Sequence, residues 1–591
     1  MTNEKKNNYK TAFTRKKKYQ ENDESTDNKL IRTLNLFDLT LLTTGGTLGA
    51  GVYVLAGVVA KTFAGPAVVL SFILAAVVSS FAGLCYAEFA GRIPKAGSAY
   101  IYTYVAIGEF PAFIIGWNLI IEHIIGVASI GKATSNYIDS LLGYPQKQFM
   151  LKHFPIHVGF LGEFPDIMSF LCIMLITMLV AWGVRESSRV NNILTLLNLL
   201  TILTVVLTGC YFARISNWTI KKSDIPSGVN GGEGGFLPFG WSGVIAGAAK
   251  CFYGFIGFDS IASTGDETKN PKRNIPLALI ISLICITSVY VSIAIVMTMM
   301  WPYYDQDSNA PLPVIYDNLG MSFIKYIISG GAIFALTTTL IGAIFPLPRI
   351  LYAMSCDGLL FQILSNINNT TKTPFISSVI CGLISGTLAV IFNLEQLIDM
   401  ASIGTFQAYT IVCICVLLLR YKANNKMKNT IDLNNSNGSI IYRILIKWCN
   451  LLGIKTPNSD TQAVSRVYIL VYVFAAFCLS SSLTSINVYE SIRNYFVVVS
   501  VILAVMLIFI MCLLNRLPQA DENMYFKVPC VPLIPCFSIF LNIYLMMTLD
   551  YKTWIRFFVW IILGLLIYWL YGFKHSLESS EKKEENEVSK L

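Results

Sequence analysis

Long apolar runs alternate with short polar connections along most of the chain. A helix of roughly twenty apolar residues is long enough to cross the hydrocarbon core of a bilayer. Runs of that length predict about fourteen membrane-spanning helices, near residues 36–60, 66–91, 109–134, 165–184, 190–213, 242–263, 276–301, 322–345, 373–392, 396–420, 464–484, 495–515, 530–549 and 554–573. The pattern therefore predicts an all-α polytopic membrane protein.

The first apolar run, residues 36–60, carries four glycines near its centre: Gly45, Gly46, Gly49 and Gly51. Each glycine weakens a helix by about 1 kcal/mol relative to alanine, so the glycines predict an unwound stretch at mid-membrane. Unwound backbone is tolerated there only where protein or a water-filled cavity supplies hydrogen-bond partners. The alternative interpretation is a close helix crossing through small residues.

A second run, residues 242–263, is interrupted in the same way by Gly254 and Gly257, and Asp259 follows. The first run opens one set of five predicted spans, and this run opens the next set. Two glycine-interrupted spans at corresponding places in two halves of a chain indicate the substrate site of a secondary transporter. The pair therefore predicts a binding site near the middle of the membrane.

Composition supports a membrane protein and places its ends. Hydrophobic residues make up 54% of the chain and charged residues 13%, with a mean hydropathy of +0.59, which excludes a water-soluble globular protein. The N-terminal region is basic and lacks the apolar core of a signal peptide. By the positive-inside rule it stays in the cytosol, and an even number of spans returns the C-terminus to that side. The net charge of +9 then reflects topology and contact with anionic lipid, not nucleic-acid binding.

The same pattern divides the chain into five parts. They are a basic cytosolic tail (1–35), a ten-helix core with broken helices 1 and 6 (36–420), a cytosolic linker (421–463), four C-terminal spans (464–573) and a cytosolic tail (574–591). The 14 cysteines are scattered and mostly lie inside spans, where a cysteine behaves as a small hydrophobe. The 4 histidines show no metal-ligand spacing, so we expect no metal and no cofactor.

Three carboxylates within the spans are candidate functional residues, because a charge in the membrane is costly. Glu122 lies deep in the third span, next to His123, and its structural alternative is a protonated acid bonded within the bundle. Asp259 lies beside the second break, and together these two acids would suit a positively charged solute. Glu88 lies about one turn from the cytosolic end of the second span, where it either reaches the interface or lies on the solute path.

Two asparagines stand out for other reasons. Asn198 lies among the leucines of the fifth span, where interhelical hydrogen bonds explain such residues more often than substrate contacts do. Asn217 begins an Asn-Trp-Thr acceptor for N-glycosylation, in a loop that the topology places outside the cell. The sequence therefore predicts a glycoprotein modified at Asn217.

Five segments carry a resemblance to a known family. They are GGTLGAGVYVLAG, AGLCYAEFAGRIPKAGSAY, GWNLIIEHIIG, CFYGFIGFDSIASTGDETKNPKRNIP and FPLPRILYAMSCDGLLF. Together they resemble the cationic amino acid transporter family, within the amino acid, polyamine and organocation superfamily. The resemblance runs from about residue 30 to residue 420, and the last four spans match only the family's fourteen-span layout. It implies a five-plus-five inverted repeat of the leucine-transporter type, with alternating access around a site at the membrane midplane.

The resemblance also implies how a substrate would bind at its amino acid end. The backbone amides of Ala50 and Gly51 would take the substrate carboxylate. The backbone carbonyls of Thr47, Tyr253 and Ile256 would take its ammonium group. Main-chain groups of the broken helices would thus bind both the carboxylate and the ammonium group of the substrate.

Other roles implied by the resemblance belong to side chains. Phe255 would cover the solute as a thin gate, and Asp259 with Glu122 would select a cationic side chain. Glu88 would be required for transport through its effect on the gate. Ala343 would leave room for a long substrate side chain, whereas a bulky residue there would favour alanine-sized solutes.

One departure from the family's proton-coupled bacterial members concerns energy coupling. These bacterial members are similar to this chain in the fifth span but carry a lysine where this chain has Asn198. Because asparagine does not titrate, we expect sodium-independent uniport or exchange of L-arginine, L-lysine and L-ornithine with little proton coupling. The membrane potential would drive uptake, and the expected location is the plasma membrane.

Other functions stay open at this point. Neutral amino acid exchangers attach a single-span glycoprotein through a cysteine after the third span, but the loop 135–164 has none, so we expect no disulfide-linked subunit. A neutral amino acid or polyamine transporter remains an alternative, as does a nutrient sensor with the transporter fold. An enzyme would need clustered catalytic side chains near one interface, so we expect none.

Overall fold

The computed structural model of the chain describes residues 15–17, 32–49, 51–157, 161–226, 228–229, 231–307, 310–423, 456–486, 492–520, 524–549 and 551–577. These residues form helices, and the strand-like pairings among them are three isolated bridges. Most of the predicted cytosolic linker and of both tails lies outside the described residues.

The helices of the first half of the chain begin with a run of short segments. They are α2 (Leu36–Thr47), η2 (Gly51–Leu55), α3 (Ala56–Val59), η3 (Ala60–Ala64), η4 (Gly65–Ala67), α4 (Val68–Arg92), α5 (Ala99–Ala106), α6 (Glu109–Leu141), α7 (Pro145–His153), α8 (Ile167–Trp182), α9 (Val184–Phe212), η5 (Ile215–Trp218), η6 (Lys222–Asp224) and α10 (Gly240–Tyr253).

The second half continues from a short helix that follows the second predicted break. Its elements are η7 (Phe258–Glu267), α11 (Pro271–Met300), η8 (Tyr303–Asp305), α12 (Pro311–Asn318), α13 (Ser322–Ile344), α14 (Pro346–Cys356), η9 (Gln362–Ser365), α15 (Phe375–Ile391), α16 (Leu394–Arg420), α18 (Ser459–Ser485), α19 (Arg493–Asn515), α20 (Leu533–Met547), α21 (Tyr551–Ile567), η12 (Tyr568–Gly572) and α22 (Phe573–His575).

Ten of the described helical segments are long and apolar enough to cross a membrane. The segment Leu36–Arg92 contains two of the predicted spans, and the shorter apolar helices α8, α15 and α20 coincide with three more. The prediction of an all-helical, multi-pass membrane protein is therefore confirmed. The total of fourteen spans and the inverted repeat stay predictions.

Both predicted breaks are present at the glycines. Helix α2 ends at Thr47 and helical structure resumes at Gly51, while α10 ends at Tyr253 and η7 begins at Phe258. The second break turns at Gly257, whose φ of +112° is a left-handed conformation that glycine adopts without steric cost. The sequence therefore predicted the position of both interruptions.

The broken helices lie in the interior of the bundle. Helix α2 packs against α9, α11 and α13, and α4 packs along α10 and α11. The buried face of α2 includes Leu39, Leu42 and the polar Thr43 and Thr47. Helices α6 and α16 pack on each other behind this group. Unwound backbone is thereby enclosed by protein and shielded from lipid, as the physics of the membrane requires.

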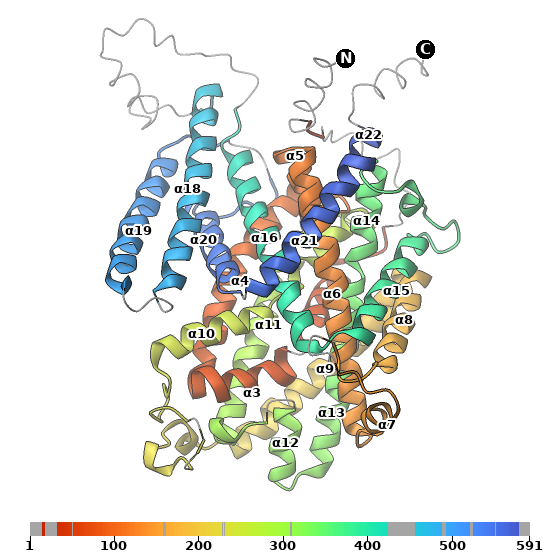
Figure 1. Cartoon of the computed structure of the whole chain (residues 1–591), viewed down its shortest axis with the longest axis vertical. Coiled ribbons are helices and arrows are strands. Elements are labelled where there is room, and N and C mark those ends of the chain that lie inside the picture. The colour runs from red at the N-terminus through yellow and green to blue at the C-terminus, as the bar shows by residue number, and fades with distance from the viewer. Residues whose placement is uncertain are drawn as a thin grey trace, which may run out of the picture.

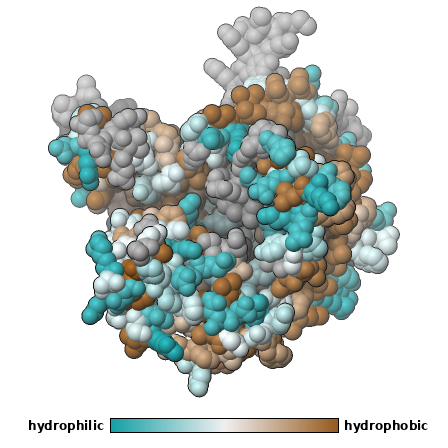
Figure 2. Space-filling model, turned by 60° about the horizontal axis from the view of Figure 1, so that its bottom comes forward, coloured by the Kyte–Doolittle hydropathy of each residue, from teal (hydrophilic) through white to brown (hydrophobic). Residues whose placement is uncertain are grey.

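Figure 1 shows the core as an upright bundle, with α5 and α22 at one end and α7 and α12 at the other. Helices α18, α19 and α20 stand together at one side of it. Helix α20 connects this group to the core by packing on α16 and α4. Figure 2 turns the α7 and α12 end toward the viewer and shows hydrophilic side chains spread over it, with hydrophobic side chains along the right-hand edge.

Candidate functional site

A cavity of about 90 Å³ lies between the two helix breaks. Its lining comes from α2, η2, α6, α10, the turn before η7, η7, α13 and α16, and consists of Gly46, Thr47, Gly51, Glu122, His123, Gly126, Ile130, Tyr253, Gly254, Ile256, Gly257, Asp259, Ser260, Thr339, Gly342, Ala343 and Thr405. Typical ligand pockets have volumes of roughly 300–1,000 Å³. This cavity is therefore contracted, and a solute could enter only if the surrounding helices moved apart.

The structure brings together seven of the nine residues expected to contact a substrate. The seven that line the cavity are Thr47, Gly51, Glu122, Tyr253, Ile256, Asp259 and Ala343. Ala50 lies outside the described residues. Phe255 is described but does not line the cavity. The grouping of the seven is a geometric finding, and their roles remain to be proposed.

Two buried carboxylates face this cavity from different helices. Glu122 is 5% exposed on α6, and Asp259 is 3% exposed on η7. The hydroxyl of Thr405 donates to Oε1 of Glu122, and the hydroxyl of Tyr409 donates to Oδ1 of Asp259 at 3.0 Å. Within the described part of the chain, neither carboxylate has an ion-pair partner, and Oε2 of Glu122 has no hydrogen-bond donor. The site therefore contains two buried acidic side chains that have no basic partner among the described residues.

Main-chain groups of both breaks reach the same place. Helical structure resumes at Gly51, where amide groups lack an intrahelical acceptor. The hydroxyl of Tyr290 on α11 lies 2.6 Å from the carbonyl oxygen of Gly254 and 3.1 Å from that of Thr47. The carbonyl of Thr47, expected to bind an ammonium group, thus already has a neighbouring donor. The amide of Gly49 also donates to the Thr47 carbonyl at 2.9 Å, so both lone pairs of that oxygen have a neighbouring donor in this conformation.

Phe255 does not line the cavity in this conformation, and its expected role as a gate stays a prediction. Its side chain is fully buried, and the centre of its ring lies 5.1 Å from the centre of the Tyr290 ring. The reason is local: the amides of Phe255 and Ile256 donate to the carbonyls three residues earlier, which continues a helical turn beyond α10. That turn directs Ile256 into the cavity and Phe255 toward α11.

Several glycines allow the helices to approach one another here. A Cβ atom on Gly342 would lie 2.6 Å from the Cα atom of Gly46, and a Cβ atom on Gly51 would overlap the hydroxyl of Tyr290. Gly126 lines the same cavity, but a Cβ atom there would meet nothing within 4 Å. The glycine-rich stretch therefore provides both a break and a close helix crossing, so the two interpretations of the sequence apply to different glycines.

Asn198 contacts the broken first helix and is buried. Its side-chain oxygen accepts a hydrogen bond of 2.7 Å from the hydroxyl of Tyr53, and its amide nitrogen donates to the carbonyl of Leu48 at 3.4 Å. Leu48 directly follows α2. Asn198 thus connects the two sides of the break across about five residues, as an interhelical hydrogen-bonding residue would.

Glu88 does not line the cavity. It is buried at the end of α4, and both of its oxygens accept hydrogen bonds of 2.8 Å from the guanidinium group of Arg420. The backbone amide of Val528 donates to the same carboxylate at 2.7 Å. Glu88 thus has a buried ion-pair partner inside the protein, and its expected role in transport stays a prediction.

A second buried ion pair joins α14 to the end of η7. The guanidinium of Arg349 on α14 lies 3.1 Å from a carboxylate oxygen of Glu267 at the end of η7. The carbonyl of Glu267 accepts hydrogen bonds from the amides of Thr33 and Leu34, just before α2. The two broken helices and α14 are thus joined on this side of the cavity.

The predicted glycosylation acceptor is partly accessible. Asn217 lies in η5 and is half-buried, and its amide nitrogen donates to the carbonyl of Met299 at 2.7 Å. Glycosylation replaces one of the two hydrogens on this nitrogen, so the other can keep that hydrogen bond. The glycosylation itself stays a prediction.

Sequence reasoning missed part of the site. Thr405, Tyr409 and Tyr290 contact its key groups from α16 and α11, and Thr339 lines it from α13. Each lies in an unbroken apolar helix, where hydroxyl residues are common and no glycine signal marks them. His123 also lines the cavity, and its position beside Glu122 was the one available signal.

Comparison with known proteins gives the family. Residues 34–455 match the model of amino acid permeases, and residues 526–576 match that of the C-terminus of such permeases. The chain is 36% identical over 583 residues to the human cationic amino acid transporter 4, across 95% of this chain and 90% of that protein. It is 33% identical over 573 residues to Arabidopsis thaliana cationic amino acid transporter 4, vacuolar, across 93% of each. It is 31% identical over 574 residues to cationic amino acid transporter 3, mitochondrial, of the same plant, across 93% of this chain and 92% of that protein. The chain is a member of the cationic amino acid transporter family of amino acid permeases.

Proposed function

We propose that this permease carries cationic amino acids, namely L-arginine, L-lysine and L-ornithine, across the membrane. The observation that supports this most directly is the pair of buried carboxylates, Glu122 and Asp259, without a cationic partner in the described residues. An uncompensated buried charge costs several kcal/mol. A substrate with a positively charged side chain would remove that cost, whereas a neutral amino acid would not.

The amino acid end of the substrate binds to the main chain of the two breaks. Amides of Ala50 and Gly51, at the start of a helical segment, bind the carboxylate with the help of the positive end of the helix dipole. Carbonyls of Thr47, Tyr253 and Ile256 accept hydrogen bonds from the ammonium group. This arrangement uses groups that line the same contracted cavity, apart from Ala50.

The side chain of the substrate extends toward α6 and α13. Glu122 and Asp259 pair with its positive charge, and Ala343 leaves the space for its length. Phe255 covers the bound solute only after the turn around Gly257 rearranges, since its ring now packs on Tyr290. The glycine at that turn has the conformational freedom for such a change.

The proposed transport cycle requires a particular number of spans and a particular internal symmetry. We infer fourteen spans in all: a ten-helix core, residues 36–420, built as a five-plus-five inverted repeat, and four additional C-terminal helices, residues 464–573. Alternating access would open one end of the cavity at a time. Release at the α5 end would require the Arg349–Glu267 pair to separate, because that pair joins both broken helices to α14.

Neither sodium nor a proton drives the cycle in this proposal. Asn198 holds the break in the first helix with uncharged hydrogen bonds, and an asparagine does not exchange protons. The substrate's own charge then couples uptake to the membrane potential, at about 2.3 kcal/mol per charge per 100 mV. Transport is therefore uniport or exchange.

We place the protein in the plasma membrane with both termini in the cytosol. The acceptor at Asn217 supports this orientation, since N-glycans are added on the opposite side. Some relatives are named vacuolar or mitochondrial, so the choice of cellular membrane needs a test of its own. Imaging a fluorescent fusion tests the membrane, and fluorescence on internal membranes would contradict this placement. Treatment with a glycosidase tests the orientation, and an unchanged apparent mass would contradict it.

The test of the proposed activity is uptake of radiolabelled arginine in oocytes under voltage clamp, in sodium-free medium. We expect saturable uptake with an inward current that grows as the membrane is hyperpolarised, and inhibition by lysine and ornithine. Entry of neutral amino acids without current, with no uptake of arginine, would contradict the proposal. Binding without any movement of solute would indicate a sensor.

A further inference from the structure

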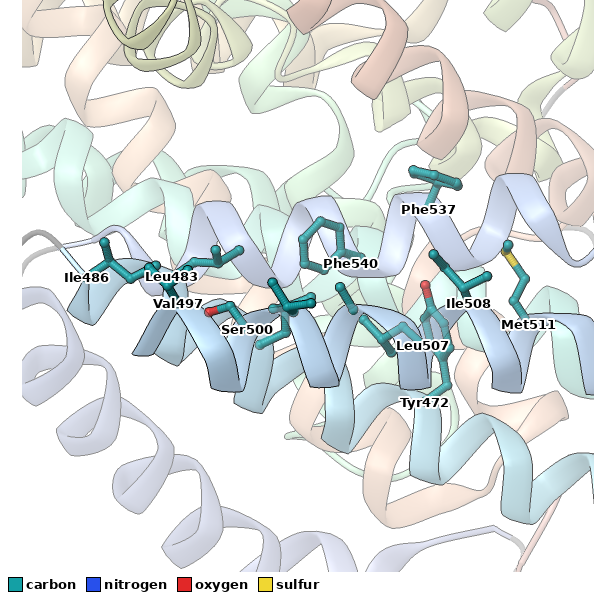
Figure 3. A pocket seen from close by; sticks show the side chains of 13 residues that line it. Tyr472, Leu483, Ile486, Val497, Ser500, Leu507, Ile508, Met511, Phe537 and Phe540 are labelled. Carbon is teal, nitrogen blue, oxygen red and sulfur yellow. The ribbon is translucent and has the colours of Figure 1, made fainter. Parts of the chain in front are cut away.

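A groove of about 480 Å³ lies among α18, α19 and α20, well separated in sequence from the cavity at the helix breaks. It is lined by Tyr472, Leu479, Leu483, Ile486, Val497, Ser500, Val501, Ala504, Leu507, Ile508, Met511, Phe537 and Phe540. Figure 3 shows the labelled side chains in a row that runs from Ile486 and Leu483 at one end to Ile508 and Met511 at the other. The groove is therefore elongated.

The groove opens toward the hydrocarbon of the bilayer. Helices α18 and α19 are both candidate membrane spans. Helix α19 packs along α18, and α20 packs along α18 and α16, so the groove is the space left between α19 and α20. On its rim, Val501 is 59% exposed and Ile508 is 58% exposed. Whatever occupies the groove therefore enters from the membrane, not from water.

The lining excludes a polar occupant along the depth of the groove. It contains two hydroxyl groups, and both are engaged: Tyr472 donates to the carbonyl of Cys536 at 2.9 Å, and Ser500 donates to the hydroxyl of Ser482 at 2.9 Å. All other lining side chains are apolar. A hydrocarbon chain would gain dispersion contacts there and lose no hydrogen bonds.

The length of the groove fits a single extended chain. Its lining on α19 runs from Val497 to Met511, and on α18 and the residue that follows it from Tyr472 to Ile486, which at 1.5 Å per residue is about 21 Å along each helix. That distance is about two thirds of the roughly 30 Å hydrocarbon core. A narrow chain lying parallel to the helices would fill it.

A positive charge lies at one end of this path. Arg493 lies four residues before Val497 and seven before Ser500, a spacing that puts it on the groove face of α19. Its side chain is exposed and has no ion-pair partner among the described residues. Arg516, at the other end of α19, already has an interaction partner. The charge at the Arg493 end thus complements an anionic headgroup.

We propose that the groove binds one membrane phospholipid, with an acyl chain between α19 and α20 and its phosphate at Arg493. Guanidinium groups pair with phosphate oxygens through two parallel hydrogen bonds, which fixes the headgroup at the membrane surface. The acyl chain fills the space between α19 and α20, where the two helices do not pack closely on each other. The lipid belongs to the leaflet in which Arg493 lies, opposite the α5 and α22 end.

The test uses the full chain in nanodiscs that contain phosphatidylcholine with a photoreactive diazirine in its acyl chain. After irradiation, cross-linked residues are mapped by peptide mass spectrometry. We expect labelling to concentrate on the groove residues of α18, α19 and α20. Ala504→Trp should reduce this labelling roughly tenfold by filling the groove, whereas Ile502→Trp, which is 62% exposed and does not line the groove, should leave it unchanged.

Further arms distinguish the occupant. Arg493→Gln should weaken labelling by the phospholipid probe but not by a photoreactive fatty acid, which lacks the phosphate. Equal labelling around all faces of α19 would show only bulk lipid and overturn the proposal. Preferential labelling by a photoreactive sterol, or cross-links between two copies of the chain through the groove, would overturn it as well. Ala504→Trp is compared with Ile502→Trp for yield and melting temperature, so a folding defect is recognised.

Discussion

The hydroxyl of Tyr290 donates a hydrogen bond of 2.6 Å to the carbonyl oxygen of Gly254. It also lies 3.1 Å from the carbonyl oxygen of Thr47, so one side chain of α11 reaches the ends of both broken helices. Each of these carbonyls lies beyond the regular hydrogen bonding of its helix. Tyr290 therefore connects the two breaks beside the cavity.

Tyr290→Phe should impair both stability and uptake. Removing the hydroxyl leaves the buried carbonyl of Gly254 without its donor, at a cost of about 1–3 kcal/mol. We expect a lower melting temperature of the purified protein and a raised KM for arginine. Tyr211→Phe is the matched control, because Tyr211 is 83% exposed on α9. Equal melting temperatures and KM values for the two variants would show that Tyr290 does not support the breaks.

Gly51→Ala should abolish uptake, whereas Gly126→Ala should be tolerated. Both glycines line the cavity, but a Cβ atom on Gly51 would overlap the hydroxyl of Tyr290, and one on Gly126 would meet nothing within 4 Å. Arginine uptake, normalised to surface expression, compares the two variants. Similar uptake by both would contradict the packing described at the first break.

The ion pair between Glu88 and Arg420 should behave as a unit. Removing one partner of a buried pair leaves an uncompensated charge and costs about 3–5 kcal/mol, whereas replacing both with apolar residues costs far less. We therefore expect Glu88→Leu or Arg420→Leu alone to lower the melting temperature strongly, and the double variant to recover most of it. Additive losses in this cycle would exclude a coupled pair.

Ala343→Met should narrow the range of substrates. Ala343 lines the cavity on α13, and a longer side chain there would occupy the space proposed for the substrate side chain. We expect arginine uptake to fall by roughly tenfold or more, while uptake of alanine-sized amino acids persists or rises. Ala343→Ser, which adds little volume, controls for substitution itself. Unchanged arginine uptake by the methionine variant would remove Ala343 from the site.

Much of the fold and part of the site could be predicted from the sequence. The apolar runs predicted the membrane helices. The glycine clusters located both breaks, because glycine at the centre of a span weakens the helix there. Because the breaks must face a cavity, residues beside them, such as Thr47 and Ile256, line it. Glu122 was found through the high cost of a carboxylate in the membrane.

The rest depended on contacts between distant parts of the chain. Arg420 lies 332 residues from Glu88, and no local pattern connects them. The turn that directs Phe255 toward Tyr290 depends on two backbone hydrogen bonds that the glycine pattern does not specify. Thr405 and Tyr409 come from an unbroken helix, where only tertiary packing brings their hydroxyls to the two carboxylates.

The central claim is that Glu122 and Asp259 select a positively charged substrate. Citrulline tests it, because it has nearly the shape of arginine but an uncharged side chain. The measurement is the ratio of arginine to citrulline uptake in wild type, Glu122→Gln and Asp259→Asn, with the exposed Glu163→Gln as control. We predict a strong preference for arginine in wild type and the control, and its collapse in at least one of the two variants. An unchanged ratio in both variants, at normal surface expression, would contradict the claim.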